Sequence, residues 1–353
     1  MKIGILTFHY AYNYGALFQA VSLFDYLKSL GNDVYMIDYR NAEISKHYSL
    51  YPSTAPNKNW KFYLTLCFRL MMRYLRFNNF KNFISSNITF IVPQKISELD
   101  CVIIGSDQVW NTKLTNGYDP FYWGDIPFNG NIISYATSMN ATALSLDDKI
   151  LISKKLENFN SISVREQLMV TMLQPLSEKK IIQVLDPTML NDFNYWKSRC
   201  RKNKGNKRYV LAYPLRDGDV VMKKAHDIAQ TMSCELKVIK GGADWNPFTI
   251  VHNTAGPAEA LSLIDGASFI LTSSFHGTAL SILLRKQFYT IRCRDGNNVR
   301  TESILTILGL SDRLLSSEDN INIDAHIDYI KVESLLETER KKSRFFLINS
   351  IHE

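Results

Sequence analysis

The sequence predicts an α/β protein made of two parallel-sheet domains in series. Short apolar runs typical of buried strands alternate with longer stretches that repeat apolar residues at helical spacing. This alternation stops at a basic, glycine-containing stretch over residues 201–208 and then starts again. The chain has 353 residues, more than one ordinary hydrophobic core accommodates, which also favours two domains.

The first half of the chain begins with a strand–helix–strand unit. Residues 2–8 form a short apolar run, residues 16–30 follow a helical pattern that ends at Gly31, and residues 34–39 form a second apolar run. This order is typical of a parallel sheet. A loop is expected over 41–57 and a helix over 58–83. Further elements are expected at 100–104, 131–136, 161–164 and 181–184 (strands) and at 147–158 (helix).

The second half repeats the alternation after the basic stretch. We expect strands at 209–213, 236–239, 268–272 and 288–291, and helices at 217–231, 257–265, after 273 and at 326–350. The predicted domains are therefore 1–203 and 204–325. The C-terminal helix, 326–353, is expected to pack back on the first domain.

Composition indicates a globular protein of the cytoplasm. Apolar residues make up 46% of the chain and charged residues 21%, which excludes a disordered or fibrous chain. The five cysteines are scattered without a Cys-x-x-Cys pair, so neither a disulfide framework nor a metal site is expected. We expect no signal peptide and no membrane-spanning run. The net charge of +7 suits an acidic partner such as a phosphorylated substrate or an anionic lipid.

Polar motifs follow several of the predicted strands, where parallel sheets bind their ligands. The stretch 272–277 ends a strand and opens a helix, whose free amides favour an anion. His276 in this stretch could bind phosphate or transfer a proton. A histidine held by a backbone carbonyl in a tight turn is the alternative, and the spacing leaves both open.

The other strand ends carry weaker signals. Arg165 could clamp a carboxylate or phosphate, or it could pair with Glu166 or another nearby acid. Asp107 could accept hydrogen bonds from a sugar hydroxyl or act as a base. The stretches 13–15 and 105–107 use residue types that also simply form turns, and Asp186 before a proline is typical of a cap.

The segment 58–82 is basic and aromatic and contains no acidic residue. A basic amphipathic helix of this kind can lie on an anionic membrane surface. A helix docked on the domain with a solvated basic face is the alternative. No recognised nucleic-acid-binding motif accompanies the charge, so nucleic acid is not an expected partner.

The ordered set of motifs resembles that of the polysaccharide pyruvyl transferases. The resemblance covers roughly residues 1–300 and depends on the order and spacing of all the motifs together. They are NYGALFQ (13–19), GSDQVWN (105–111), VRE (164–166), DPT (186–188) and TSSFHG (272–277).

The resemblance implies two Rossmann-like domains facing a cleft, similar to the GT-B glycosyltransferases. It implies phosphoenolpyruvate as donor, with no cofactor and no metal. The implied product is a pyruvate ketal on a sugar of a bacterial surface polysaccharide precursor, expected to be carried by undecaprenyl diphosphate. A protein with such an acceptor is expected to work in the cytoplasm, with peripheral contact to the inner face of the anionic membrane.

The resemblance also implies which residues act. Arg165 and His276 would contact phosphoenolpyruvate, and the expected catalytic residues are His276, Arg165 and Asp107. Many members of the family carry an arginine where this chain has Ser274, so another cation, Arg292 or Arg294, is expected to replace it. The expected donor site is completed by Ser273, Ser274, Gly277 and Arg292. The expected acceptor site contains Asn13, Tyr14, Gly15, Ser106 and Asp107.

Two other functions stay open. A nucleotide-sugar glycosyltransferase would share the two-domain plan, but such enzymes often hold the ribose with a carboxylate shortly after the His–Gly turn. No acidic residue occurs here between Gly277 and Arg294. A non-catalytic relative that binds a saccharide is the other possibility, and Ser274 is the feature that suggests it.

Overall fold

The computed structural model of the chain describes residues 1–47, 60–139, 141–201, 207–239, 250–251, 254–294, 296 and 298–352, without the side chains of 60–66, 69, 250 and 251. The chain forms two compact units, each described by itself. The first comprises Met1–Tyr48, Asn87–Asn191 and Glu333–Glu353, and the second Ser49–Ser86 and Asp192–Val332. The linker predicted at 201–208 falls largely on 202–206, outside the described residues.

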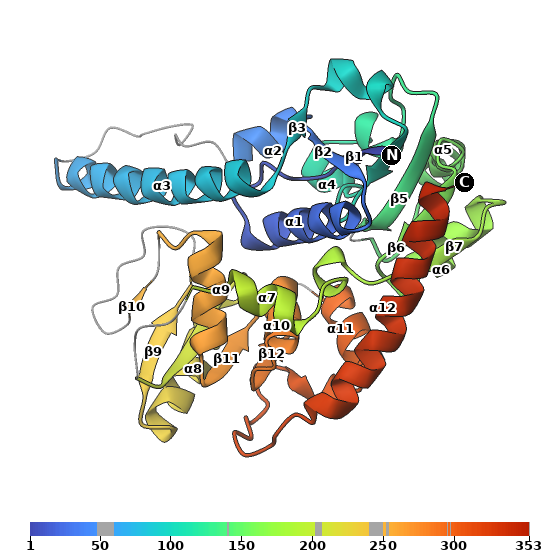
Figure 1. Cartoon of the computed structure of the whole chain (residues 1–353). Helices are drawn as coiled ribbons and strands as arrows, with labels where there is room; N and C mark the ends of the chain where they lie inside the picture. Colours follow the sequence, from blue (N-terminus) through green and yellow to red (C-terminus); the bar gives the residue numbers. More distant parts are fainter. Residues whose placement is uncertain are drawn as a thin grey trace. The chain divides into compact units, whose positions relative to one another are not determined.

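The first unit contains a parallel sheet of seven described strands in the order β3-β2-β1-β4-β5-β6-β7 (Figure 1). Chain order runs outward from β1 on one side and from β4 on the other. The sheet therefore has its topological switch point between β1 and β4, the place where open parallel sheets bind ligands beyond their carboxyl ends. The strands are β1 (Lys2–Leu6), β2 (Asp33–Ile37), β3 (Phe90–Ile91), β4 (Cys101–Ile104), β5 (Asn131–Thr137), β6 (Ser161–Val164) and β7 (Ile181–Gln183).

Several helices of the first unit begin directly after a side chain that caps their first turn. Asn13 caps α1, and Ser145 with Asp148 forms a reciprocal capping box on α5. The loop predicted over 41–57 is wrong in its first part, because the Asn41 side chain accepts from the amides of Glu43 and Ile44 and so starts α2. The helices are α1 (Tyr14–Ser29), α2 (Ala42–His47), α4 (Thr112–Thr115), α5 (Leu146–Leu156) and α6 (Gln167–Leu173).

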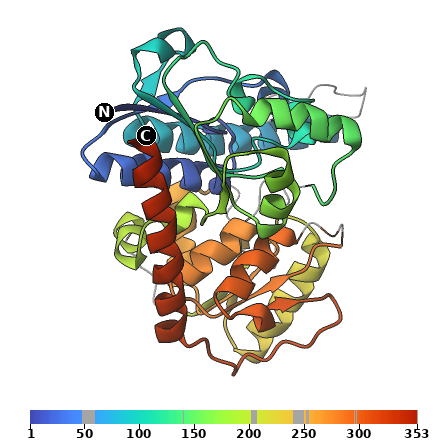
Figure 2. The same ribbon diagram turned by 90° about the vertical axis from the view of Figure 1, so that its right-hand side faces the viewer.

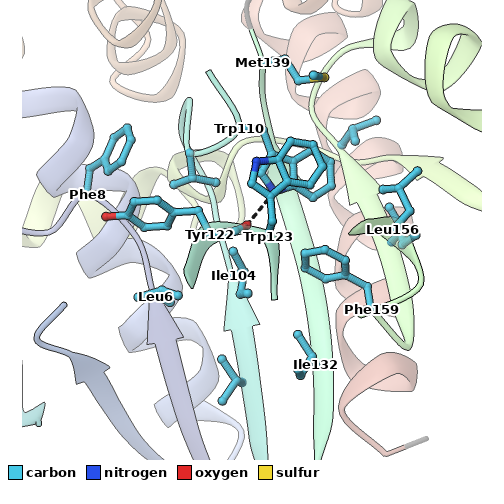
Figure 3. Packing of buried hydrophobic residues seen from close by; sticks show 14 of the residues in the cluster. Leu6, Phe8, Ile104, Trp110, Tyr122, Trp123, Ile132, Met139, Leu156 and Phe159 are labelled. Carbon is cyan, nitrogen blue, oxygen red and sulfur yellow. Dashed lines mark hydrogen bonds between the residues drawn. The ribbon is translucent and has the colours of Figure 1, made fainter. Parts of the chain in front are cut away.

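Two stacked indoles lie in the core of the first unit. The rings of Trp110 and Trp123 are 4.5 Å apart and nearly parallel, and the Trp110 indole N–H donates to the Tyr122 carbonyl at 2.7 Å (Figure 3). Both indoles are almost fully buried. Since Trp110 ends the loop after β4, this packing anchors the loop that carries Asp107.

The second unit contains a parallel sheet of six described strands in the order β10-β9-β8-β11-β12-β13, with its switch point between β8 and β11. The predicted α/β class with two parallel sheets is thereby confirmed. The strands are β8 (Tyr209–Tyr213), β9 (Glu235–Val238), β10 (Ile250–Val251), β11 (Phe269–Thr272), β12 (Phe288–Ile291) and β13 (Leu314–Leu315). The helices are α3 (Trp60–Asn87), α7 (Phe193–Arg199), α8 (Gly218–Thr231), α9 (Pro257–Gly266), α10 (Phe275–Leu283) and α11 (Val299–Ile307).

The C-terminal helix α12 (Tyr329–Ile351), red in Figure 2, contacts the segment that follows β7 through two hydrogen bonds. The buried Arg340 donates through Nε to the Met189 carbonyl at 2.9 Å, and the Ser343 hydroxyl accepts from the Leu185 amide at 2.9 Å. These bonds hold residues 185–189, and with them Asp186. Among the helices that the structure describes, none has the length and apolar character needed to cross a membrane.

Candidate active site

Polar side chains gather at the carboxyl edge of the first sheet. Asp107 follows β4, Arg165 and Glu166 follow β6, and Asp186 follows β7. Because these strands are parallel neighbours, residues separated by up to 79 positions come into one cluster. The sequence had marked each of these residues on its own strand end, and the sheet brings them together.

Arg165 lies at the centre of this cluster and is only 5% exposed. Its Nη1 donates to Asp186 Oδ2 at 2.5 Å, its Nε donates to Glu166 Oε1 at 3.2 Å, and its Nη2 lies 3.9 Å from Asp107 Oδ1. Burial acts to lower the pKa of the guanidinium, but the charges of the three carboxylates together raise that pKa above its usual value. The guanidinium therefore stays charged and holds all three acids.

The carboxylates of the cluster are also held from their other sides. Asp186 Oδ1 accepts from the amide and the hydroxyl of Thr188 at 3.0 and 2.7 Å. Glu166 Oε1 accepts from the Ser138 hydroxyl at 2.9 Å. The pairing of Arg165 with nearby acids, one of the two roles that the sequence left open, is thus present. Its predicted contact with the donor stays a prediction.

Asp107 sits in a turn that leaves its carboxylate partly accessible. Its φ of 76° lies in the left-handed region, which aspartate tolerates better than most residues, and its Oδ1 accepts from the Gln108 amide at 2.9 Å. Ser106 is fully buried, and its hydroxyl donates to the Ala136 carbonyl at 3.0 Å. Asp107 is therefore the residue of this loop that can meet a ligand, whereas the Ser106 side chain bonds within the fold.

The motif at the start of α1 lies at the switch point of the first sheet. Asn13 caps the helix by accepting from the Gly15 amide at 2.8 Å, and Tyr14 is 3% exposed. The sequence analysis assigned no role to Gln19, yet its side-chain amide donates to the Thr7 hydroxyl at 2.9 Å. That hydroxyl donates in turn to the Ser106 carbonyl, so this chain of bonds ties α1 to both central strands.

An open pocket lies at the carboxyl edge of the second sheet, at its switch point between β8 and β11. Its cavity volume is about 20 Å³, and the rest of the depression opens to solvent. Residues from β12, from the loops after β8, β11 and β12 and from the starts of α10 and α11 line it: Leu215, Arg216, Ser273, Phe275, Thr290, Ile291, Cys293, Asn298, Arg300 and Thr301. The lining residues are apolar or hydroxyl-bearing, together with two arginines and no acidic residue, and this composition is compatible with a small anion.

Ser273 and Phe275 of the TSSFHG stretch line this pocket, whereas Ser274, His276 and Gly277 are not among its lining residues. The Ser273 hydroxyl accepts from the amides of Leu215 and Arg216 at 3.0 and 3.1 Å and donates to the Arg216 carbonyl, so it fixes the loop after β8. The Ser274 hydroxyl accepts from the Gly277 amide at 3.3 Å as the N-cap of α10. His276 is 7% exposed, and its ring packs edge-on against Phe275.

A sequence model described as "polysaccharide pyruvyl transferase" matches residues 13–295, about four-fifths of the chain. The chain belongs to the polysaccharide pyruvyl transferase family. No curated protein sequence matches the chain. The match spans the motifs from Asn13 to Gly277, on which the resemblance rested.

Several solved structures are similar in architecture. A UDP-GlcNAc 2-epimerase from Methanocaldococcus jannaschii is 12% identical, over 96% of this chain and 92% of that one, with a TM-score of 0.46. The Streptomyces sp. SF2575 glycosyltransferase SsfS6, complexed with thymidine diphosphate, is 11% identical over 99% of both chains, with a TM-score of 0.44. The Escherichia coli ADP-heptose LPS heptosyltransferase II is 12% identical, over 96% of this chain and 99% of that one, with a TM-score of 0.39.

Arginines that the sequence analysis did not single out line the pocket of this pyruvyl transferase family member. Arg292 pairs with Glu302, and Arg294 lies 3.2 Å from Asp219, and neither is among the residues that line the pocket. Arg216 and Arg300 do line it. No sequence motif marks these two residues, because the loop after β8 and the start of α11 meet only in the folded sheet.

Among the residues that the structure describes, no group of three or more His, Cys, Asp or Glu side chains is arranged to hold a metal ion. The buried acids around Arg165 are engaged by that guanidinium.

We expect Arg165→Met to lower the free energy of unfolding by about 3–5 kcal/mol, since it leaves buried carboxylates without their cation. Urea unfolding followed by tryptophan fluorescence measures this, because Trp110 and Trp123 lie in the same unit. Arg40→Met is the matched control. Arg40 donates to Asp38 at 2.8 Å but is 58% exposed, so it should cost about 1 kcal/mol or less. Equal effects of the two substitutions would contradict the interpretation.

Gly277→Ala should destabilise the protein by about 1–3 kcal/mol through overpacking. A Cβ at this position would overlap Thr272 Oγ1 and lie 3.0 Å from the Tyr213 ring, and that hydroxyl is fixed by bonds to the Tyr213 carbonyl and the Ser274 amide. Gly218→Ala at the start of α8 is the control, since its Cβ would meet only Pro214 at 3.7 Å. Thermal unfolding should leave the control's midpoint at or above that of the wild type. If the thermal midpoint of Gly277→Ala equals that of Gly218→Ala, the fold accommodates a methyl group beside Thr272 and Tyr213 and the overpacking argument is wrong.

Proposed function

We propose that this chain transfers the pyruvyl group of phosphoenolpyruvate to two hydroxyls of one sugar in a surface-polysaccharide precursor and releases phosphate. Membership of the polysaccharide pyruvyl transferase family supports the reaction class. The observation that carries the donor assignment is the pocket at the second switch point, with Arg216 and Arg300 in its wall. Phosphoenolpyruvate is a small donor with a carboxylate and a phosphate, and forked guanidinium groups recognise both.

The reaction defines what the site has to supply. Protonation of the methylene carbon of the enol phosphate creates positive charge on the carbon that bears the carboxylate. One sugar hydroxyl attacks that carbon and loses its proton. The bond from carbon to the phosphate oxygen then breaks, and a second hydroxyl of the same sugar forms the second C–O bond. Of the two protons that the hydroxyls lose, one balances the proton on the methyl group and the other leaves with phosphate.

Donor binding is assigned to the second unit. Arg216 and Arg300 take the place of the family arginine that Ser274 replaces, and they hold the carboxylate and phosphate. The amides at the start of α10 add partial positive charge next to Ser273 and Phe275. His276 opens the same helix and acts on the phosphate or in proton transfer. Arg292 stays a sequence prediction, since its side chain pairs with Glu302.

Acceptor binding is assigned to the carboxyl edge of the first sheet. Asp107 contacts the acceptor hydroxyls and takes up a proton, and Arg165 holds it in position from 3.9 Å. Asn13, Tyr14, Gly15 and Ser106 build the surrounding turns. The predicted direct contact of Arg165 with the donor is kept as a second role for this residue. The acceptor is a saccharide on a lipid diphosphate, approached from the cytoplasmic side.

Incubation of the protein with phosphoenolpyruvate and a lipid-linked oligosaccharide tests the proposal. Phosphate release together with a product heavier by one ketal-linked pyruvate supports it. Turnover of a nucleotide sugar instead would favour the glycosyltransferase alternative. Saccharide binding without turnover of either donor would favour a non-catalytic relative.

His276→Ala and His276→Gln should each lower turnover by about 100- to 10,000-fold if this side chain transfers a proton. The glutamine variant preserves most of the side-chain volume, which matters because His276 is 7% exposed. His226→Gln, at a side chain 57% exposed, is the control and should keep full turnover. Phosphate release is measured with variants whose thermal midpoints match the wild type. Near-normal turnover of His276→Gln would leave this histidine a structural role only.

Arg300→Met and Arg216→Met should each weaken phosphoenolpyruvate binding by about 10- to 100-fold, the value of a charge-assisted hydrogen bond. Isothermal titration calorimetry measures the dissociation constant without an acceptor. Arg294→Met is the matched control, because Arg294 is 60% exposed and does not line the pocket. If Arg294→Met loses as much affinity as Arg300→Met, the assignment of phosphoenolpyruvate to this pocket is wrong.

A further inference from the structure

Helix α3 presents apolar side chains to solvent along one face. Cys67, Phe68, Met71, Tyr74 and Leu75 form this face, called the α3 face below, and all five are exposed. The exposed fractions of the four large side chains are 45%, 50%, 55% and 44% in that order. Phe68, Met71 and Leu75 follow one another at intervals of three and four residues, which places them on adjacent turns of one side of the helix. The helix itself is labelled in Figure 1.

The α3 face is on the opposite side from the part of the helix that is buried. Phe80 is fully buried and follows Met71 by nine residues, which is about two and a half turns of helix. Near it, the Asn79 side chain donates to the Thr254 carbonyl at 2.7 Å in the same unit. A surface helix of a soluble domain ordinarily turns its polar side outward. Here the outward side is apolar, which indicates that a partner covers it.

The charge around α3 identifies the kind of partner. Residues 44–97 contain eight lysines and arginines and no acidic residue. The whole chain has 41 basic and 34 acidic side chains, so this stretch carries its excess of positive charge and the remainder is close to neutral. Among the described side chains of the helix, Arg73 and Lys81 are exposed. An apolar face with cations on the other sides of the helix is the composition of a helix that lies in a membrane interface.

We propose that the α3 face docks on an anionic phospholipid bilayer. Phe68, Met71 and Leu75 enter the boundary between headgroups and acyl chains. Arg73 and Lys81, on the other sides of the helix, add attraction to the anionic surface over the distance of a Debye length. A second copy of the chain would bring two basic segments together, which opposes pairing through this face. Nucleic acid would match the charge but not the exposed apolar side chains.

Membrane docking goes beyond the proposed pyruvyl transfer and does not depend on it. The inference uses only the exposure and charge of one helix. If the acceptor is lipid-linked, docking holds the protein where the acceptor is, but the surface would bind a bilayer whatever the donor is.

Sedimentation with vesicles tests the proposal on the full chain without any donor. The wild type should bind vesicles of phosphatidylglycerol and phosphatidylcholine, and binding should fall as the salt concentration rises. It should bind pure phosphatidylcholine vesicles much more weakly. Failure to bind the anionic vesicles, or equal binding to both kinds, overturns the proposal.

Two variants of α3 separate the apolar and the charged contributions. Phe68→Ser/Met71→Ser/Leu75→Ser should weaken vesicle binding by at least about tenfold, because it removes the apolar area that enters the bilayer. Arg73→Glu/Lys81→Glu should weaken it by about 25-fold or more, at roughly fivefold for each cation lost near an anionic surface. Matching thermal midpoints of these surface variants and the wild type establish that they are folded.

Helix α5 supplies matched controls. Leu146, Ile150 and Leu151 are exposed by 73%, 55% and 38%, and Lys149 and Lys154 are exposed as well. Leu146→Ser/Ile150→Ser/Leu151→Ser and Lys149→Glu/Lys154→Glu make the same changes in hydrophobicity and net charge at another site. They should retain vesicle binding within about threefold. Equal losses in the α3 and α5 variants would overturn the proposal, since binding would then follow the overall composition.

An environment-sensitive fluorophore on Cys67 tests whether the helix itself meets the bilayer. Cys67 is exposed, whereas Cys101 and Cys293 are buried. Emission should shift to the blue when anionic vesicles are added, while the same probe on a Cys67→Ser/Leu146→Cys variant should not shift. Sedimentation equilibrium tests whether a second copy of the chain occupies the α3 face instead. A dimer in the wild type that is lost in the α3 serine variant would assign the face to a second copy and overturn the proposal. Phosphate release with a water-soluble acceptor reports on pyruvyl transfer separately.

Discussion

Parallel strand pairing is the constraint on which both polar clusters depend. In each sheet all described strands point the same way, so the loops that carry polar motifs emerge at one edge. On the two sides of each switch point, the connections after the central strands run toward opposite edges of the sheet. The loops after these two strands therefore diverge, and side chains can gather between them. In the first unit that edge holds Asp107 and Arg165, and in the second it holds the pocket with Arg216 and Arg300.

The two edges use charge in different ways. At the first edge, one buried guanidinium is surrounded by three carboxylates, and the surplus negative charge suits a site that accepts protons and hydroxyl groups more than one that binds anions. At the second edge, two arginines are among the residues that line the pocket, and none of its described lining residues is acidic. This difference is the physical basis for assigning the acceptor to the first unit and the donor to the second.

The hydroxyl groups of the TSSFHG motif mainly build structure. Ser273 fixes the loop after β8, Ser274 caps α10, and the absence of a side chain at Gly277 lets the helix approach Thr272. The motif thus brings Phe275 and His276 to the edge of the sheet. Replacement of the family arginine by Ser274 keeps the cap, so the fold at this point does not require the arginine.

The sequence by itself determined the elements whose signals are local. Apolar runs, helical spacing and capping residues located the central strands and the long helices within a few residues, and the ordered motifs identified the family. The two-residue strands β3, β10 and β13 were missed, because edge strands this short carry no periodicity. The short helix α2 was missed because a single side chain, Asn41, starts it.

Only the tertiary structure decided which charges meet. The sequence left open whether Arg165 contacts a ligand or a nearby acid. Its pairing with Asp186, 21 positions away, depends on the position of β7 beside β6 in the sheet. Arg216 and Arg300 lie 84 residues apart and share a pocket because β8, β11 and β12 are adjacent in the sheet. The basic and aromatic composition of α3 can likewise be read from the sequence. The folded structure shows which side is outward, because Phe80 is buried while Phe68, Met71 and Leu75 are exposed. Contacts between residues distant in the chain depend on sheet order and helix orientation, and no local pattern encodes either.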